Sequence, residues 1–148
     1  MPLDQSYIGR TYPFPPYLVG REKIREFATA VGAVDPLHHD VEAAKAAGYP
    51  DVVAPPTFPI IFTMAALWEI VFDPEWGIDY GRVVHGDQRF VYERPVVAGD
   101  ELVVVTYIEE IMFRSGNDFL NTRQEVRTTG GEPVATVFHK TVVRGDNA

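Results

Sequence analysis

The sequence predicts an α+β fold in which a few helices precede one antiparallel sheet. Up to about residue 72, apolar residues recur at helical spacing or run without a break. After DPEWGIDYG the apolar period changes to two, and four long segments alternate apolar with polar residues. Helices first and strands afterwards are typical of an α+β chain. No repeat or low-complexity linker interrupts the 148 residues, so residues 1-148 are expected to form a single domain.

The first half of the chain is expected to contain a short strand and two small helices. The prolines between Pro15 and Val19 suit an edge strand. From Arg21 to Val31 the apolar residues lie at i, i+3, i+4 and i+7, which predicts a helix that ends near Gly32. Asp40 is expected to cap a second, short helix that Gly48 closes.

A third helix is expected from about Thr57 to Phe72, with Thr57 as its N-cap. Its apolar run is shorter than the roughly 20 residues that a membrane-spanning helix needs, and it contains Glu69. Because the run is apolar almost all round, it predicts a helix wrapped by the rest of a soluble protein, and no membrane association.

Four long strands are expected in the second half, with turns at RPVVAGD, RSGND and TGGE. One face of the third strand carries only polar residues, so the sheet is expected to be antiparallel and covered on one side. The four strands are expected at residues 83–93, 101–113, 119–129 and 133–144.

Composition restricts the classes of function. The chain has no cysteine, which excludes disulfides, thiolate metal ligands and a cysteine nucleophile and fits a cytoplasmic protein. Its net charge of -8 argues against a nucleic-acid partner, because such a protein needs a basic surface. The first residues show no basic segment followed by an apolar run, so we expect no signal peptide. No cofactor is expected. A metal site is not expected either, because His38, His39 and Asp40 are adjacent and no further histidine lies at ligand spacing.

Three segments of the chain resemble the MaoC-like dehydratases, also called (R)-specific enoyl-thioester hydratases. They are VGREKIREFATAVG, AAKAAGYPDVVAPPTF and DQRFVYERPVVAGDEL, and the resemblance covers nearly the whole chain. The most similar group is the FAS1-like dehydratase domains, which include the small subunits of mycolic-acid-type 3-hydroxyacyl dehydratases. The resemblance implies a single hot-dog fold, in which the antiparallel sheet is wrapped round a long central apolar helix. It also implies a lyase of fatty acid metabolism that adds water to acyl thioesters or removes it.

The catalytic motif of that family is roughly Gly-Asp-x-Asn-Pro-x-His, in which the Asp and the His share proton transfer with one water. In this sequence Gly32, Pro36 and His38 are in register with the motif. Asp35 stands at the asparagine position, and Ala33 stands where the family has its catalytic aspartate. Because alanine cannot accept a proton, half of the usual acid–base pair is missing.

A second departure from the family lies where the central helix begins. The family has an Ala-His-Gly-like step there, and the glycine N–H polarises the thioester carbonyl. Here the step is Ala54-Pro55-Pro56-Thr57, and Pro56, which has no N–H, falls on the donor position. The N–H of Thr57 is the nearest replacement.

The candidate catalytic residues are therefore His38, as general base, and Asp35, as a substitute for the missing aspartate. The competing interpretation of His38 is a loop histidine that is exposed or hydrogen-bonded locally. Asp before Pro is also a common turn starter, and that structural role is the competing interpretation. His39, next to His38, is expected to lie at the surface.

The candidate substrate-binding residues are Thr57, Phe58, Phe62 and His85. Phe58 and Phe62 are hypothesised to line an acyl-chain tunnel, whereas the competing interpretation packs them in the core. His85 either lines the same pocket or lies on a solvated strand edge. His139, within the last strand, is expected to be structural.

Three hypotheses of function follow. The favoured one is the acyl-chain-binding subunit of a 3-hydroxyacyl-thioester dehydratase, paired with a hot-dog chain that carries an intact Asp/His motif. The alternative is a self-sufficient homodimeric dehydratase that uses His38 with Asp35 or a residue of the partner. The third is a non-enzymatic acyl-thioester-binding or scaffold protein. Open sheet edges predict a homodimer or a heterodimer in every case. The sequence leaves open the carrier (CoA or acyl carrier protein), the acyl chain length and the direction of the reaction.

Overall fold

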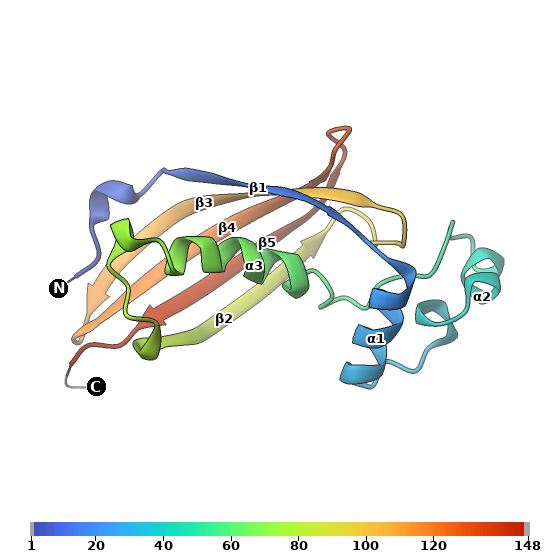
Figure 1. The fold of residues 1–148 in the computed structure, drawn as a ribbon, viewed down its shortest axis with the longest axis horizontal. Coiled ribbons are helices and arrows are strands. Elements are labelled where there is room, and N and C mark those ends of the chain that lie inside the picture. Colours follow the sequence, from blue (N-terminus) through green and yellow to red (C-terminus); the bar gives the residue numbers. More distant parts are fainter. Residues whose placement is uncertain (1, 147–148) are drawn as a thin grey trace.

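The computed structural model describes residues 2–146 and confirms the α+β class. Five strands form one sheet in the order β1-β3-β4-β5-β2, and every neighbouring pair is antiparallel (Figure 1). The strands are β1 (Thr11–Leu18), β2 (Val83–Tyr92), β3 (Glu101–Arg114), β4 (Asn117–Thr128) and β5 (Pro133–Val143). The helices are α1 (Arg21–Val31), α2 (Val41–Ala46) and α3 (Ile60–Val71), and short 3-10 turns lie at Gln5–Tyr7, Pro36–His38, Pro74–Trp76 and Tyr80–Arg82.

The central helix α3 lies along one face of the curved sheet (Figure 1). Phe62, Leu67 and Ile70 are almost fully buried between the helix and the strands, as the apolar sequence of this helix predicts. On the strands the buried residues alternate with half-exposed ones, so that one face of the sheet packs on α3 and the other faces outward. This is the hot-dog arrangement that the family resemblance implies. No helix within residues 2–146 is long and apolar enough to span a membrane.

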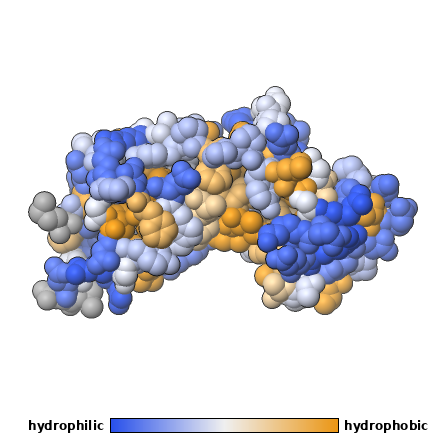
Figure 2. Space-filling view, viewed as in Figure 1, coloured by the Kyte–Doolittle hydropathy of each residue, from blue (hydrophilic) through white to orange (hydrophobic). Residues whose placement is uncertain are grey.

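The segment from α1 to α2 forms a lobe that projects beyond one end of the sheet (Figure 1). Gly32 ends α1 with a φ of 74°, in the left-handed region that glycine adopts readily. The Asp40 carboxylate accepts a hydrogen bond from the N–H of Glu42 at 2.9 Å and so caps α2, as predicted. Figure 2 shows hydrophobic surface in the middle of the molecule, where α3 begins, beside the hydrophilic surface of α1. The lobe and α3 therefore meet at an apolar junction.

Two element boundaries differ from the prediction because of prolines. β1 begins at Thr11 instead of Pro15, and an irregularity between Phe14 and Tyr17 takes the two prolines out of the ladder. The central helix begins at Ile60, not at Thr57, because the prolines on either side of Thr57 hold the chain in turns. The expected N-cap at Thr57 is therefore wrong.

Candidate functional site

His38 lies in the loop between α1 and α2, and its ring is fixed by the segment that leads to α3. Its Nδ1 is 2.6 Å from the carbonyl oxygen of Val53, and the Val53 N–H donates to the Leu37 carbonyl at 2.9 Å. Because a carbonyl can only accept, Nδ1 carries a proton and donates it, so in the neutral tautomer the lone pair lies on Nε2. This is the tautomer that a general base requires. Val53 was not among the predicted site residues, since a backbone carbonyl distant in sequence leaves no pattern.

The structure does not bring Asp35 and His38 together. The Asp35 carboxylate accepts from the N–H of Leu37 at 2.9 Å and caps the turn Pro36–His38, which is the structural role weighed against catalysis. Within residues 2–146, no carboxylate forms a hydrogen bond or ion pair with the His38 ring. The catalytic role of Asp35 stays a prediction.

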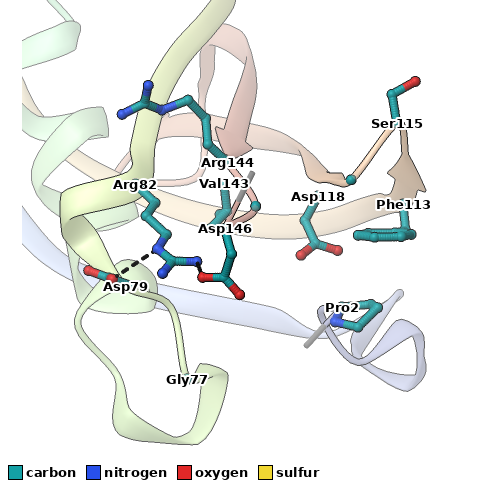
Figure 3. A pocket seen from close by; sticks show the side chains of 12 residues that line it. Pro2, Gly77, Asp79, Arg82, Phe113, Ser115, Asp118, Val143, Arg144 and Asp146 are labelled. Carbon is teal, nitrogen blue, oxygen red and sulfur yellow. Dashed lines mark ion pairs between the residues drawn. The ribbon is translucent and has the colours of Figure 1, made fainter. Parts of the chain in front are cut away.

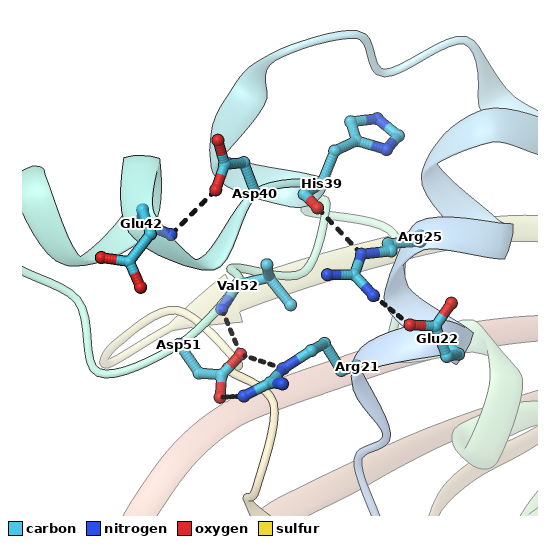
Figure 4. Close-up of polar contacts among 8 residues, drawn as sticks. All are labelled: Arg21, Glu22, Arg25, His39, Asp40, Glu42, Asp51 and Val52. Atoms are coloured by element: carbon cyan, nitrogen blue, oxygen red, sulfur yellow. Dashed lines mark hydrogen bonds and ion pairs between the residues drawn. The ribbon is translucent and has the colours of Figure 1, made fainter.

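Ala33, which stands where the family has its catalytic aspartate, is held in the same loop by a hydrogen bond to its backbone carbonyl. Nε2 of His39 lies 2.8 Å from the Ala33 carbonyl oxygen, so the half-buried His39 ring closes the loop across six residues. The Arg25 Nε donates to the His39 carbonyl at 2.8 Å and fixes the loop to α1 (Figure 4). His39 is thus a structural part of the loop, where the sequence suggested a surface residue.

An ion pair fixes the lobe to the segment before α3. Arg21 donates two hydrogen bonds to Asp51, at 3.0 and 2.7 Å, and the N–H of Val52 donates to the same carboxylate at 2.7 Å (Figure 4). The hydrogen bonds from Arg21 lower the pKa of the Asp51 carboxyl. The pair joins residues 30 apart, so the sequence alone gave no sign of it. It connects α1 to the segment from which Val53 holds His38.

Thr57 lies in the turn that precedes α3, with its N–H free. The Phe58 N–H donates to the Pro55 carbonyl at 2.9 Å, which closes a turn around Pro56 and Thr57. The Tyr92 hydroxyl, at the end of β2, donates to the Pro56 carbonyl, and burial raises the pKa of the Tyr92 phenol, so this donor stays protonated. The peptide bond between Pro56 and Thr57 is trans, so the Thr57 N–H points away from the Pro56 carbonyl that Tyr92 binds. It has no acceptor among residues 2–146 and is available to bind a carbonyl oxygen.

Phe58 and Phe62 are packed inside the chain, with 0% and 1% of their surface exposed. Phe58 contacts Phe27 edge to face at 5.5 Å between ring centroids, and Phe62 stacks on Tyr17 at 5.0 Å. Both side chains belong to the core that joins the lobe, α3 and the sheet. Their contact with an acyl chain stays a prediction.

His85 lies exposed on β2, beside the buried His139 of β5, with ring centroids 5.2 Å apart. Both line a hollow of about 80 Å³ between the two strands and α3. Its other walls are formed by Met64, Leu67, Trp68, Tyr80, Val83 and Thr141.

A larger hollow, of about 360 Å³, is lined by Arg82, Phe113 and Asp118 among others (Figure 3). It lies at the end of the sheet opposite the lobe of α1 and α2 (Figure 1). Among its charged groups, Arg82 pairs with Asp79 and Asp146, and Asp118 accepts from the Leu3 N–H at 3.0 Å. No group of three or more His, Asp or Glu side chains within residues 2–146 is placed to hold a metal ion. The candidate site is therefore the loop of His38 together with the turn of Thr57.

Fold and sequence together define a hot-dog protein of the dehydratase and hydratase class. The family model described as "FAS1-like, dehydratase domain region" matches residues 6–137, and the chain belongs to this family. Curated relatives include the UPF0336 protein of Saccharopolyspora erythraea, which is 58% identical over 98% of this chain and 94% of its own length. UPF0336 protein SCO4636 of Streptomyces coelicolor is 56% identical over 97% of each chain.

Two solved structures share both fold and sequence with this chain. One is a chain of the C-terminally truncated HadBC (3R-hydroxyacyl-ACP dehydratase) complex from Mycobacterium tuberculosis. It has 34% identity and a TM-score of 0.83, and the match covers 92% of this chain and 96% of that one. The other is a MaoC-like dehydratase with 34% identity and a TM-score of 0.87, and the match covers 96% of this chain and 43% of that longer one. The hot-dog dehydratase family indicated by the sequence is thereby confirmed.

Proposed function

We propose that this chain is the acyl-chain-binding subunit of a 3-hydroxyacyl-thioester dehydratase or enoyl-thioester hydratase. The partner is a second hot-dog chain that supplies an intact Asp/His pair. In the complex, the free N–H of Thr57 and the apolar surface beside α3 bind the acyl thioester, carried by CoA or by acyl carrier protein. The similar HadBC structure, itself a complex, supports this arrangement.

One observation carries the proposal. His38 stands at the position of the family's catalytic histidine, but no carboxylate within residues 2–146 pairs with its ring. Ala33 has no acid–base group, and the Asp35 carboxylate is used to cap the turn Pro36–His38. A positioned acid–base group contributes typically about 10²- to 10⁴-fold to a rate, so its loss leaves a single chain nearly inactive. A partner chain with the missing group restores the reaction.

The test is hydration of a trans-2-enoyl-CoA by the purified chain, alone and after co-expression with a MaoC-like chain encoded next to it. We expect no turnover by the chain alone and strong turnover by the complex. His38→Ala in this chain should leave the turnover of the complex within about twofold. Mutation of the partner's Asp or His should abolish it.

Other outcomes favour the alternatives. Strong turnover by the chain alone that His38→Ala abolishes would establish the homodimeric dehydratase and overturn the proposal. Binding of acyl-CoA without turnover in any combination of chains would establish a non-enzymatic thioester-binding protein. Calorimetric titration with a saturated acyl-CoA measures binding directly. It distinguishes the homodimeric dehydratase and the non-enzymatic thioester-binding protein, which both bind, from a chain that binds no thioester.

A further inference from the structure

A row of polar side chains crosses the face of the sheet that packs on α3. Gln88 on β2 pairs with His139 on β5, and His139 pairs in turn with Thr122 on β4. Gln124 follows Thr122 on the same face and donates through Nε2 to the Thr63 carbonyl of α3 at 2.8 Å. Residues directly opposite one another in adjacent strands have neighbouring side chains, so these four form one cluster, called here the polar row.

The polar row is buried, and it has hydrogen-bonding atoms without partners. His139, Thr122 and Gln124 are 3%, 2% and 0% exposed. The atoms Gln88 Nε2, Thr122 Oγ1, Gln124 Oε1 and His139 Nε2 are buried and have no partner within residues 2–146. Buried polar atoms are almost always paired, and an unpaired one is costly. Four such atoms on neighbouring residues of one sheet face therefore indicate that another polar group occupies this place.

The chemistry of the row selects a neutral occupant. It offers an amide N–H donor, an amide oxygen acceptor, a hydroxyl that does both and an imidazole. No carboxylate, lysine or arginine belongs to it, and burial lowers the pKa of His139, which keeps the ring uncharged at neutral pH. An ion has no counter-charge here, whereas a hydroxyl or a carbonyl group satisfies several of these atoms at once.

The polar row lies beside the surface along which an acyl chain would extend. Val83 and His85 of β2 line the hollow of about 80 Å³ together with residues of α3. At the other end of β2 the Tyr92 hydroxyl donates to the Pro56 carbonyl, in the turn of Thr57. His139 is the member of the polar row that lines this hollow, together with Met64 and Leu67 of α3. These two residues lie about 6 to 10 Å along α3 from its first residue, at 1.5 Å per residue. Met64, an adaptable side chain, can repack there at low cost.

We propose that the polar row is a subsite for a hydroxyl or keto group carried on the acyl chain, beyond the thioester and the reacting carbons. The inference rests on the proposed function and makes it more specific: the substrate is an oxygen-bearing acyl thioester and not a plain fatty acyl one. The thioester is held near Thr57, the apolar part of the chain lies along α3, and the second oxygen reaches the polar row.

The experiment compares two kinds of probe by calorimetric titration of the full chain in complex with its partner. One probe is a plain medium-chain acyl-CoA, and the others have the same length and one keto group at successive distal positions. We expect at least one keto position to bind about fivefold tighter than the plain chain, as a gained hydrogen bond predicts. Thr122→Val and Gln88→Leu, which remove one polar group each, should reduce this preference and leave binding of the plain chain unchanged.

Thr136→Val is the matched control, because Thr136 lies on β5 but on the opposite face of the sheet from His139. It should change neither affinity. Equal binding of all probes, or a preference that both Thr122→Val and Gln88→Leu retain, would overturn the inference and leave ordered water as the occupant. That result would not affect the proposed function. Failure of every probe to bind would overturn the proposed thioester binding itself, and the subsite with it.

Discussion

His139 is an ionisable side chain among uncharged neighbours. Burial first, and then the nearby His85 ring, lower the pKa of His139 to about 4, from a usual value of 6.5. Around it lie Thr122 on β4, Gln88 on β2 and the apolar residues Met64 and Leu67 of α3, so His85 is the one titratable neighbour among these groups. The folded protein therefore resists protonation of this ring, whereas the unfolded chain accepts it.

The sign of the pH dependence follows from the two pKa values. Above pH 6.5 the ring is neutral in both states, and its ionisation costs nothing. Between 6.5 and about 4 the unfolded state binds the proton first, so folding stability falls as the pH falls. We predict that the free energy of unfolding decreases by about 2 kcal/mol between pH 7 and pH 5 through this residue. Urea unfolding at the two pH values measures this decrease. In His139→Gln the free energy of unfolding should no longer decrease in this way, whereas His85→Gln, a change at an exposed residue, should keep most of the decrease.

Asp35 offers a second test at the level of one residue. Its carboxylate caps the turn Pro36–His38, and asparagine caps as well as aspartate does, but it cannot transfer a proton. We predict that Asp35→Asn leaves the stability of the chain unchanged, because the cap is kept. The turnover of the complex should change by no more than about twofold. Asp35→Ala should cost about 1 kcal/mol of stability. A turnover loss of about a hundredfold in Asp35→Asn would instead make Asp35 the substitute acid–base group.

Site residues were predictable from the sequence where a motif fixes their spacing. His38 and the departure at Ala33 are visible in the sequence, because the loop has a recognisable pattern of Gly32 and Pro36. The carbonyl of Val53 that sets the His38 tautomer was not predictable. It depends on how the lobe packs against the segment before α3, and backbone acceptors carry no sequence signal.

At the level of elements, α3 contributes buried residues to both hydrophobic clusters of the core. Phe62 is 1% exposed and touches both Tyr17 of β1 and Phe58. We predict that Phe62→Ala destabilises the chain by about 3–5 kcal/mol, because it leaves a cavity between helix and sheet. Phe113→Ala is the control: this side chain is 52% exposed on β3 and should cost less than about 1 kcal/mol. Similar losses for both variants in urea unfolding would contradict a core centred on α3.

The type of each major element was predictable, and the boundaries at prolines were not. Hydrophobic periods of 3.6 and 2 identify α1 and the four long strands, since burial on one side imposes those periods. The first strand and the start of α3 were misplaced because Pro15, Pro16 and Pro59 are compatible with both an ordered element and an irregular turn. Pairing partners across the sheet decide between the two, and they are distant in sequence.

At the level of the whole molecule, the two edges of the sheet differ. β1 carries three prolines, which remove donors from its edge and protect it against pairing. β2, the other edge, has no proline and exposes Val84 and Val91 to 43% and 44%. Beside it, Phe72 and Tyr80 are 59% and 54% exposed and contact each other at 5.0 Å between centroids. An open strand edge next to exposed aromatic rings is an association surface.

We therefore predict that the chain associates with its partner, or with a second copy, along β2. A lysine on an edge strand opposes pairing, so Val84→Lys and Val91→Lys should each raise the dissociation constant of the assembly by at least about tenfold. Thr11→Lys, at an exposed residue of the other edge strand β1, should leave it unchanged. Sedimentation velocity over a concentration series measures all four proteins. A wild-type chain that stays monomeric with and without its partner, or an assembly weakened by Thr11→Lys alone, would show that β2 is not the pairing edge.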